Sequence, residues 1–233
     1  MNTEQRAVVL VSGGMDSATA VYEAIDRGYD PYFLHTSYGQ RTETKEYDCA
    51  SALARAVDAG DFLHVETGHL SKIGASSLTD EAIDVDDADL ASDEIPSTYV
   101  PFRNANLLSM AVSYAEATDC SAMFIGAHSE DFAGYPDCRP QFFEAFQRVV
   151  DVGTKPETEI KLIAPFVEWS KTEIAKRGLE LDVPYERTWS CYRTEAPACG
   201  TCDSCARRLE AFRNAGSTDP IDYAPRPDGV EDH

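Results

Sequence analysis

The chain has 233 residues, the size of one large domain, and its 41 acidic against 20 basic side chains give a net charge of −21. A surface this acidic repels phosphate backbones and anionic membranes, which argues against nucleic acid as a direct partner. No apolar run approaches the roughly 20 residues of a membrane span, and the N-terminal run is too short for a secretory signal, so we expect a soluble, cytoplasmic protein. Only six of the 20 basic residues are Lys, which together with the acidity favours a salt-rich cytoplasm.

The elements alternate along the chain. An apolar, β-branched run at 7–12 that ends at two glycines predicts a strand buried on both faces, and the helical spacing at 16–27 predicts a helix that Gly28 ends. Further strands are expected at 32–36, 62–66, 122–126 and 160–164, and further helices at 41–59, 106–117, 141–150 and 170–181, the last opened by a Ser170–Glu173 capping box. This order predicts an α/β fold with a doubly wound, mainly five-stranded parallel sheet.

Three regions follow from the pattern. We expect a nucleotide-binding α/β domain over 1–182, a helical, zinc-binding C-terminal region over 183–216 that packs on it, and a flexible tail over 217–233. Between 80 and 94, eight of fifteen residues are acidic and none is basic. This segment is expected to be a solvated excursion or a lid.

A glycine-containing turn joins the first strand to the first helix. In Ser12-Gly-Gly-Met-Asp-Ser17, two glycines let an anion approach the backbone, two hydroxyls are at hand, and the helix dipole favours phosphate. Asp16 is a candidate to hold the accompanying Mg²⁺. The alternative is a tight turn whose Ser and Asp only cap the helix. The predicted nucleotide-binding residues are Leu10, Val11, Ser12, Gly13, Gly14, Met15, Asp16, Ser17 and Ala18.

Four of the seven cysteines cluster. Cys191, Cys199, Cys202 and Cys205 have the spacing C-x7-C-x2-C-x2-C, which suits tetrahedral Zn²⁺. An iron–sulfur cluster is the rival, although the closing C-x3-C-P of a ferredoxin run is missing, and unligated thiols are the third reading. A closed four-cysteine zinc site leaves no open coordination position, so its role is expected to be structural.

Two loops near predicted strand ends carry arginines and aromatic residues that turn chemistry does not explain. An arginine pairs with a carboxylate through two parallel hydrogen bonds, and a phenyl or phenol ring stacks on a planar base. An aspartate accepts two hydrogen bonds from an amidine-like edge such as that of guanine. The candidate ligand contacts are Phe102, Arg103, Asn104, Asp131, Tyr135 and Arg139.

These motifs resemble known sequences. SGGMDS resembles the pyrophosphatase loop of the ATP pyrophosphatase superfamily, whose members cleave ATP between the α and β phosphates. Together with YVPFRN, SEDFAGYPDCRPQFFEAF and TWSCYR…CGTCDSCARR, it resembles the 7-cyano-7-deazaguanine synthase family over 8–215. Phe102 stands where that family often has Gly, and 128–130 also depart from its usual residues. The departure at Phe102 bears on the detailed shape of the expected substrate pocket.

The resemblance implies ATP-dependent conversion of 7-carboxy-7-deazaguanine and ammonia to the nitrile, a precursor of queuosine or archaeosine in tRNA. It implies an adenine nucleotide alpha hydrolase-like fold, ATP with Mg²⁺, one structural Zn²⁺ per chain and a homodimer. Asp16, Ser17, Arg103 and Arg139 are the expected catalytic residues, with Phe102, Arg103, Asn104, Asp131 and Tyr135 around the substrate. No segment is left over for a glutaminase domain, so free ammonia is the expected nitrogen donor.

Two other functions stay open on the sequence. A related tRNA thiolase would use catalytic cysteines such as Cys138, but the net charge of −21 argues against docking tRNA. A nucleotide-sensing module would bind ATP without turning it over. Release of pyrophosphate in the presence of the carboxylate substrate discriminates the sensor from the enzyme.

Overall fold

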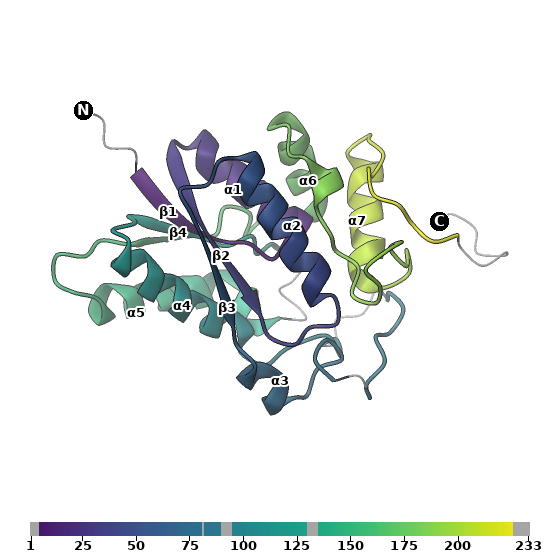
Figure 1. Ribbon diagram of the computed structural model, residues 1–233, viewed down its shortest axis with the longest axis horizontal. Coiled ribbons are helices and arrows are strands. Elements are labelled where there is room, and N and C mark those ends of the chain that lie inside the picture. The colour runs from purple at the N-terminus through teal and green to yellow at the C-terminus, as the bar shows by residue number, and fades with distance from the viewer. Residues whose placement is uncertain (1–4, 81, 90–94, 130–134, 226–233) are drawn as a thin grey trace.

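A computed structural model describes residues 5–80, 82–89, 95–129 and 135–225. It contains one parallel sheet in the order β3-β2-β1-β4-β5 (Figure 1), which confirms the predicted fold class. The strands are β1 (Gln5–Leu10), β2 (Tyr29–Ser37), β3 (Asp61–Glu66), β4 (Ala122–Phe124) and β5 (Lys161–Ile163). Each predicted strand is present, and β2 is longer than predicted at both ends.

Helices cover both faces of the sheet. α1 (Met15–Asp26) and α2 (Glu43–Ala56) lie on one face, and α4 (Arg103–Ala117) and α5 (Pro140–Gly153) lie on the other (Figure 1). Two separate apolar cores follow from this arrangement, one under each pair of helices. No helix in the described part of the chain is long and apolar enough to cross a membrane.

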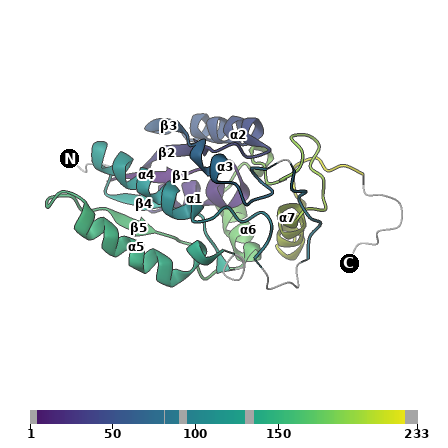
Figure 2. The same cartoon turned by 90° about the horizontal axis from the view of Figure 1, so that it is seen from below.

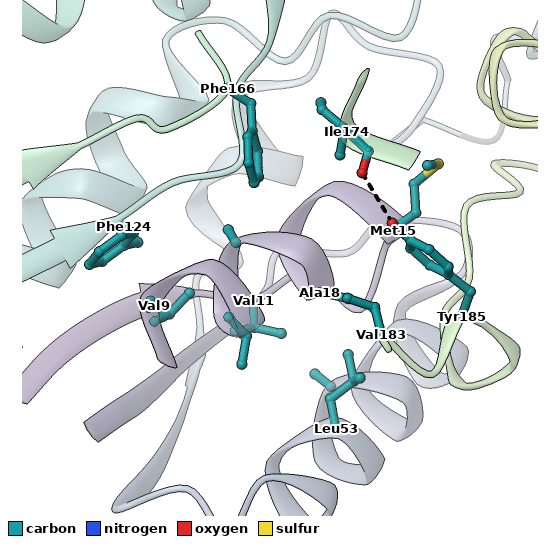
Figure 3. Close-up of a cluster of buried hydrophobic side chains, with 14 of the residues drawn as sticks. Val9, Val11, Met15, Ala18, Leu53, Phe124, Phe166, Ile174, Val183 and Tyr185 are labelled. Carbon is teal, nitrogen blue, oxygen red and sulfur yellow. Dashed lines mark hydrogen bonds between the residues drawn. The ribbon is translucent and has the colours of Figure 1, made fainter. Parts of the chain in front are cut away.

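The C-terminal half adds helices beside α1. These are α6 (Lys171–Glu180) and α7 (Asp203–Asn214), and the remaining short elements are α3 (His69–Ile73) and two 3-10 turns, Pro136–Cys138 and Tyr185–Arg187. The buried hydroxyl of Tyr185 lies 2.8 Å from Thr19 Oγ1 on α1 and donates to the carbonyl of Ile174 on α6 at 3.4 Å, the bond drawn in Figure 3. This residue therefore ties three segments distant in sequence into one core.

The strand order reverses beside β1. β1 pairs with β2 on one side and with β4 on the other, and in open parallel sheets ligands bind at the carboxyl ends of the strands at such a point. Gly126, just after β4, approaches the start of α1 so closely that a Cβ there would lie 2.9 Å from the Asp16 carbonyl. The reversal thus brings the loops after β1 and β4 together.

The acidic segment contacts the rest of the protein at Val85 and Asp87, whereas its residues 82–84, 86 and 89 are exposed to solvent, and its role as a lid stays a prediction. Arg193 donates to the carbonyl of Val85 at 3.0 Å and pairs with Asp87 at 2.7 Å, and Asp87 forms an antiparallel bridge with Cys202. Val85 is buried in the cluster around the four cysteines. Composition suggested solvation, but one arginine and one valine fix the segment. Residues 81 and 90–94 lie outside the described residues.

Part of the predicted tail is also anchored. Asp219 accepts two hydrogen bonds from the fully buried guanidinium of Arg208, at 2.7 and 2.9 Å, and a further bond from the Tyr223 hydroxyl. A bidentate pair of this kind is short, strong and directional. It holds the chain after α7 against the C-terminal region, at the end of the molecule where α7 lies (Figure 2). Residues 226–233 lie outside the described residues.

The net charge of −21 predicts a salt-dependent stability. Raising KCl from about 0.01 M to about 1 M shortens the Debye length from about 30 Å to about 3 Å and relieves repulsion between carboxylates. We expect the thermal midpoint and the activity to rise across a KCl series, with about 2–4 °C for each kcal/mol of repulsion removed. Sulfate is a poor substitute because it strengthens apolar burial in any protein. A midpoint that is flat in KCl would remove the case for a salt-adapted surface.

Candidate active site

A cavity of about 230 Å³ opens at the carboxyl ends of β1, β2 and β4. One half is formed by the turn after β1 with the loops after β4 and β5, and the other half by the loop after β2 and the start of α4. The predicted residues that line it are Leu10, Val11, Ser12, Gly14, Asp16, Ser17, Arg103, Asn104 and Tyr135. Gly13, Met15, Ala18, Phe102 and Arg139 are not among its lining residues, and Asp131 lies outside the described residues.

The turn after β1 is built for close approach to the backbone. Gly14 is the N-cap of α1, no side chain caps that helix, and the Ser12 and Ser17 hydroxyls instead bond to Gly14 N–H and C=O at 3.3 and 3.0 Å. Gly13 has φ +88°, and a Cβ there would lie 2.5 Å from the carbonyl of Glu46, so only glycine fits. This geometry does not support the alternative in which Ser and Asp only cap the helix. The helix end faces the cavity uncapped, as an anion site requires.

Asp16 points away from its own helix end. Its Oδ2 lies 3.1 Å from Lys171 Nζ and 3.7 Å from His128 Nε2. Burial opposes ionisation of Asp16, but Lys171 and then His128 outweigh it, so the pKa of this carboxyl lies below its usual value. The other oxygen, Oδ1, is buried without a hydrogen-bond partner among the described residues. A charged carboxylate with an unused oxygen is the type of ligand that Mg²⁺ prefers.

Sequence reasoning missed Lys171 and His128, although a signal for the lysine was present. The capping box that opens α6 is confirmed: the Ser170 hydroxyl accepts from Glu173 N–H at 3.3 Å, and Glu173 accepts from Ser170 N–H at 2.8 Å. This box follows β5, so Lys171 begins a helix at the same edge of the sheet as the turn after β1. Lys171 is only 7% exposed and lines the cavity. Its ammonium therefore lies in the half of the cavity formed by the turn after β1 and the loops after β4 and β5, which we call the phosphate half.

The second half of the cavity is aromatic and holds a half-buried cation, Arg103. Arg103 Nη1 donates to the Tyr38 hydroxyl at 3.0 Å, and its guanidinium lies 5.7 Å from the centre of the Tyr38 ring. Burial raises the pKa of Tyr38, so the phenol stays neutral and donates or accepts as a hydroxyl. Contact with Tyr38 raises the pKa of Arg103 and keeps its charge. Tyr135 and Tyr192 complete this half.

Asn104 fixes the loop before α5. Its backbone N–H donates to Asp137 Oδ2 at 2.8 Å, and its side chain donates to Asp137 C=O at 3.1 Å and to Cys138 Sγ at 3.2 Å. Asp137 therefore supplies the acceptor for the first turn of α4 that Phe102, the N-cap, does not. This explains why α4 begins three residues earlier than the apolar spacing predicted. The side-chain amide of Asn104 therefore holds the loop before α5 in place, and Asn104 also lines the cavity.

Two predicted ligand contacts, Phe102 and Arg139, are not among the residues that line the cavity. Phe102 has a left-handed φ of +56°, its ring is 60% exposed, and it packs edge-on against Phe142 at 6.2 Å. A left-handed residue explains why glycine is common at this position in the resembling family, because glycine adopts that conformation without strain. Arg139 is the N-cap residue of α5 and lies outside the cavity lining. Arg103 is thus the predicted arginine that the structure brings to the cavity.

The four clustered cysteines converge at the start of α7. Their sulfur atoms all lie within 4.8 Å of one another, and Cys191, Cys202 and Cys205 are buried. Four thiolates bound to zinc at about 2.3 Å lie a little under 4 Å apart, so a small contraction suffices. The other three cysteines are dispersed and buried. The set is a four-cysteine cluster consistent with zinc.

Backbone amides support thiolate character in this cluster. The N–H groups of Arg193, Thr194 and Cys199 each lie 3.4 Å from Cys191 Sγ. Thiols of Cys202 and Cys205 and these amides hold the pKa of Cys191 well below its usual value. Donors aimed at a sulfur stabilise the charged form that a metal binds. The donor set thus fits a closed, structural zinc site.

Comparisons with known proteins agree with this geometry. Residues 6–216 match the family described as Queuosine biosynthesis protein QueC. A 7-cyano-7-deazaguanine synthase of Haloarcula marismortui is 73% identical over 99% of this chain and 100% of its own. Proteins of the same name from Halobacterium salinarum and Chlorobaculum parvum are 71% and 51% identical, over 96% and 97% of this chain and 97% and 100% of theirs. The resemblance carried by the four motifs is confirmed, and the chain belongs to the Queuosine biosynthesis protein QueC family.

Proposed function

We propose that this protein is a 7-cyano-7-deazaguanine synthase, an ATP-dependent ligase that converts 7-carboxy-7-deazaguanine and ammonia to the nitrile. The observation that carries the proposal is one cavity in which an uncapped helix end with Lys171 and Asp16 meets a half-buried arginine among tyrosines. The uncapped helix end with Lys171 suits the triphosphate of ATP, and the arginine among tyrosines suits a planar base that bears a carboxylate. Relatives at 73% and 71% identity carry this activity in their names.

The reaction needs two activations of the same carbon. In the first, a carboxylate oxygen attacks the α-phosphorus of ATP, pyrophosphate departs, and ammonia displaces AMP to give the amide. In the second, the amide oxygen attacks another ATP, pyrophosphate departs again, and loss of AMP with the last nitrogen proton gives the nitrile. Each carboxylate converted therefore consumes two ATP and one ammonia. The phosphate half serves both steps, because it releases its products after the first activation and then binds a second ATP.

The phosphate half stabilises the charge that leaves. Backbone N–H groups at the start of α1, with the Ser12 and Ser17 hydroxyls, are positioned to hold phosphate oxygens, and the Lys171 ammonium compensates the growing negative charge. Asp16 orients Lys171 through the 3.1 Å contact and is the residue that would hold Mg²⁺, which when bound neutralises phosphate charge. The flanking residues Leu10, Val11, Gly13, Met15 and Ala18 shape the turn rather than contact the reacting atoms.

The substrate half orients the carboxylate. Arg103 is permanently charged and is held by Tyr38, so its guanidinium is ready to pair with the carboxylate oxygens and to orient them toward the α-phosphorus. Tyr135, whose hydroxyl lies 2.9 Å from Thr98 Oγ1, offers a fixed ring against which the base stacks. Asn104 holds the loop that carries Tyr135. The roles predicted for Asp131 and Arg139 stay predictions.

The remaining proposals concern the two regions of the chain, the zinc ion, the nitrogen donor and the oligomeric state. In this proposal residues 1–182 carry the nucleotide-binding domain and 183–216 the zinc region, which holds one Zn²⁺ per chain through Cys191, Cys199, Cys202 and Cys205. Free ammonia as the nitrogen donor stays a prediction. The homodimer that the family resemblance implies stays a prediction.

An assay of the purified protein with ATP, Mg²⁺, ammonium and 7-carboxy-7-deazaguanine tests the function. We expect the nitrile by mass spectrometry, with two pyrophosphates released for each nitrile formed and the amide as an intermediate. ATP binding without pyrophosphate release would establish a sensor instead. Pyrophosphate release with no change in the deazaguanine would contradict the assigned substrate.

A further inference from the structure

Two carboxylates line the cavity among the residues that the structure describes, Asp16 and Glu46. Asp16 belongs to the phosphate half, where it pairs with Lys171. Glu46 lies in the first turns of α2, beside the loop after β2 that carries Tyr38. The proposed function gives Glu46 no task so far, although it is the one acidic side chain that the described chain offers to the base.

The carboxylate of Glu46 is held in place by two neighbouring side chains of the cavity wall. Thr42 Oγ1 donates to Oε1 at 2.8 Å, and Gln40 Nε2 donates to Oε2 at 3.1 Å. Both donors are buried, and Gln40 is itself fixed because its Oε1 accepts from the Tyr38 N–H at 2.8 Å. The group is therefore oriented before any ligand arrives, as specific recognition requires.

Each oxygen of Glu46 still has acceptor capacity. An ionised carboxylate offers about four lone-pair sites, and the bonds from Thr42 and Gln40 use one on each oxygen. Burial raises the pKa of Glu46, and the bonds from Thr42 and Gln40 offset this only in part. A half-buried anion with unfilled acceptor sites gains from further donors.

The base of the substrate has the matching edge. A guanine-type pyrimidine edge presents the ring N1–H and the exocyclic amino N–H as two adjacent, parallel donors, and a carboxylate is the side chain that accepts from both. Arg41, Arg103 and Lys171, the Arg and Lys residues of the cavity lining, donate only, and Arg41 is already engaged with the carbonyls of Ser77, Asp80 and Ile83. Arg103 and Lys171 suit the carboxylate and the phosphates, which lie at other points of the two ligands.

We propose that Glu46 is the specificity-determining residue for the base, with Oε1 and Oε2 accepting from the N1–H and the 2-amino group of 7-carboxy-7-deazaguanine. This inference rests on the proposed function and deepens it. It assigns to Glu46 the role that sequence reasoning gave to Asp131. Arg103 then binds the carboxylate at the opposite side of the bicyclic base, so that the two residues set its orientation.

The chain supplies a matched control for a purely structural role. Glu43 lies one turn earlier on α2 and braces the same loop, since its Oε2 accepts from Gly39 N–H at 2.8 Å. Glu43 is absent from the cavity lining. Glu46→Gln and Glu43→Gln therefore remove the same charge from the same helix, one inside the cavity and one outside it.

The test compares 7-carboxy-7-deazaguanine with its 2-oxo analogue, which replaces the 2-amino donor by a carbonyl acceptor. We expect the wild-type protein to prefer the 2-amino base by about 10²–10⁴-fold in kcat/KM, since the wrong edge leaves the charge of Glu46 facing a carbonyl. In Glu46→Gln the carboxamide offers one acceptor and one donor, which suits the 2-oxo edge. The preference should therefore fall to near unity or reverse, with KM for ATP unchanged, while Glu43→Gln keeps the wild-type ratio.

Dissociation constants for the two bases, measured by calorimetry without ATP, keep the inference separate from the reaction. If the protein binds the 2-amino base selectively but forms no nitrile, the proposed function fails, and loss of that selectivity in Glu46→Gln still supports the inference. Thermal midpoints of the two variants verify folding. An unchanged ratio in folded Glu46→Gln, equal losses on both bases, or a switch found only in Asp131→Asn would overturn it.

Discussion

Asp16→Asn should lose turnover by at least about 10²–10³-fold, because the change removes the charge that orients Lys171 and that is proposed to hold Mg²⁺. Asparagine has nearly the same shape, so the turn after β1 should keep its form. The side chain does not cap α1, and helix capping is therefore not what the substitution removes. Initial rates of pyrophosphate release, measured across a Mg²⁺ series, give the result.

Variants of Lys171, the partner of Asp16, distinguish effects on stability from effects on turnover. Lys171 is 7% exposed, so Asp16→Asn removes a carboxylate charge 3.1 Å from a buried ammonium, and the thermal midpoint should fall. Lys171→Met removes the ammonium from the carboxylate, leaves only the more distant His128 beside it among the contacts described, and should act in the same direction. The double variant removes both charges and should recover much of the midpoint while its turnover stays low, because breaking a buried pair costs more than replacing it. Wild-type turnover in Asp16→Asn would reduce Asp16 to a structural residue.

The elements that could be predicted are those with a strong local signal. The buried, β-branched runs located every strand of the sheet, and the Ser170–Glu173 box located the start of α6. The glycine turn after β1 was also predictable, since its spacing between strand and helix is characteristic. Each of these depends on residues within a few positions of one another, so a single sequence contains the information.

What could not be predicted depends on contacts between distant segments. The segment at 80–94 carries a composition typical of a solvated loop, yet Arg193, more than 100 residues away, fixes it through Val85 and Asp87. The direction of the Phe102 ring follows from a left-handed backbone that the sequence does not announce. Lys171 and Glu46 reach the cavity only because the sheet places the loops after β5 and β2 at one edge.

The four-cysteine cluster should bind one zinc per chain, and Cys191→Ser should lower the thermal midpoint by about 10–20 °C. Binding of a structural zinc contributes to folding directly, and a loss of about 5 kcal/mol corresponds to such a shift at this chain length. Elemental analysis and thermal unfolding measure both quantities. The matched control is Cys120→Ser, a buried thiol in the other core, where a change of about 1 kcal/mol is expected.

The position of the cluster predicts how its loss reaches the chemistry. Ser190 and Tyr192, on either side of Cys191, line the cavity, so loosening of this segment should raise KM for the substrates before it lowers kcat. Partial removal of zinc by a chelator at low temperature allows the two constants to be followed while the protein stays folded. Iron with visible absorbance would contradict the zinc assignment. A metal-free Cys191→Ser protein with the wild-type midpoint and KM would show that the cluster neither stabilises the C-terminal region nor positions the cavity wall, because both effects depend on the same bound metal.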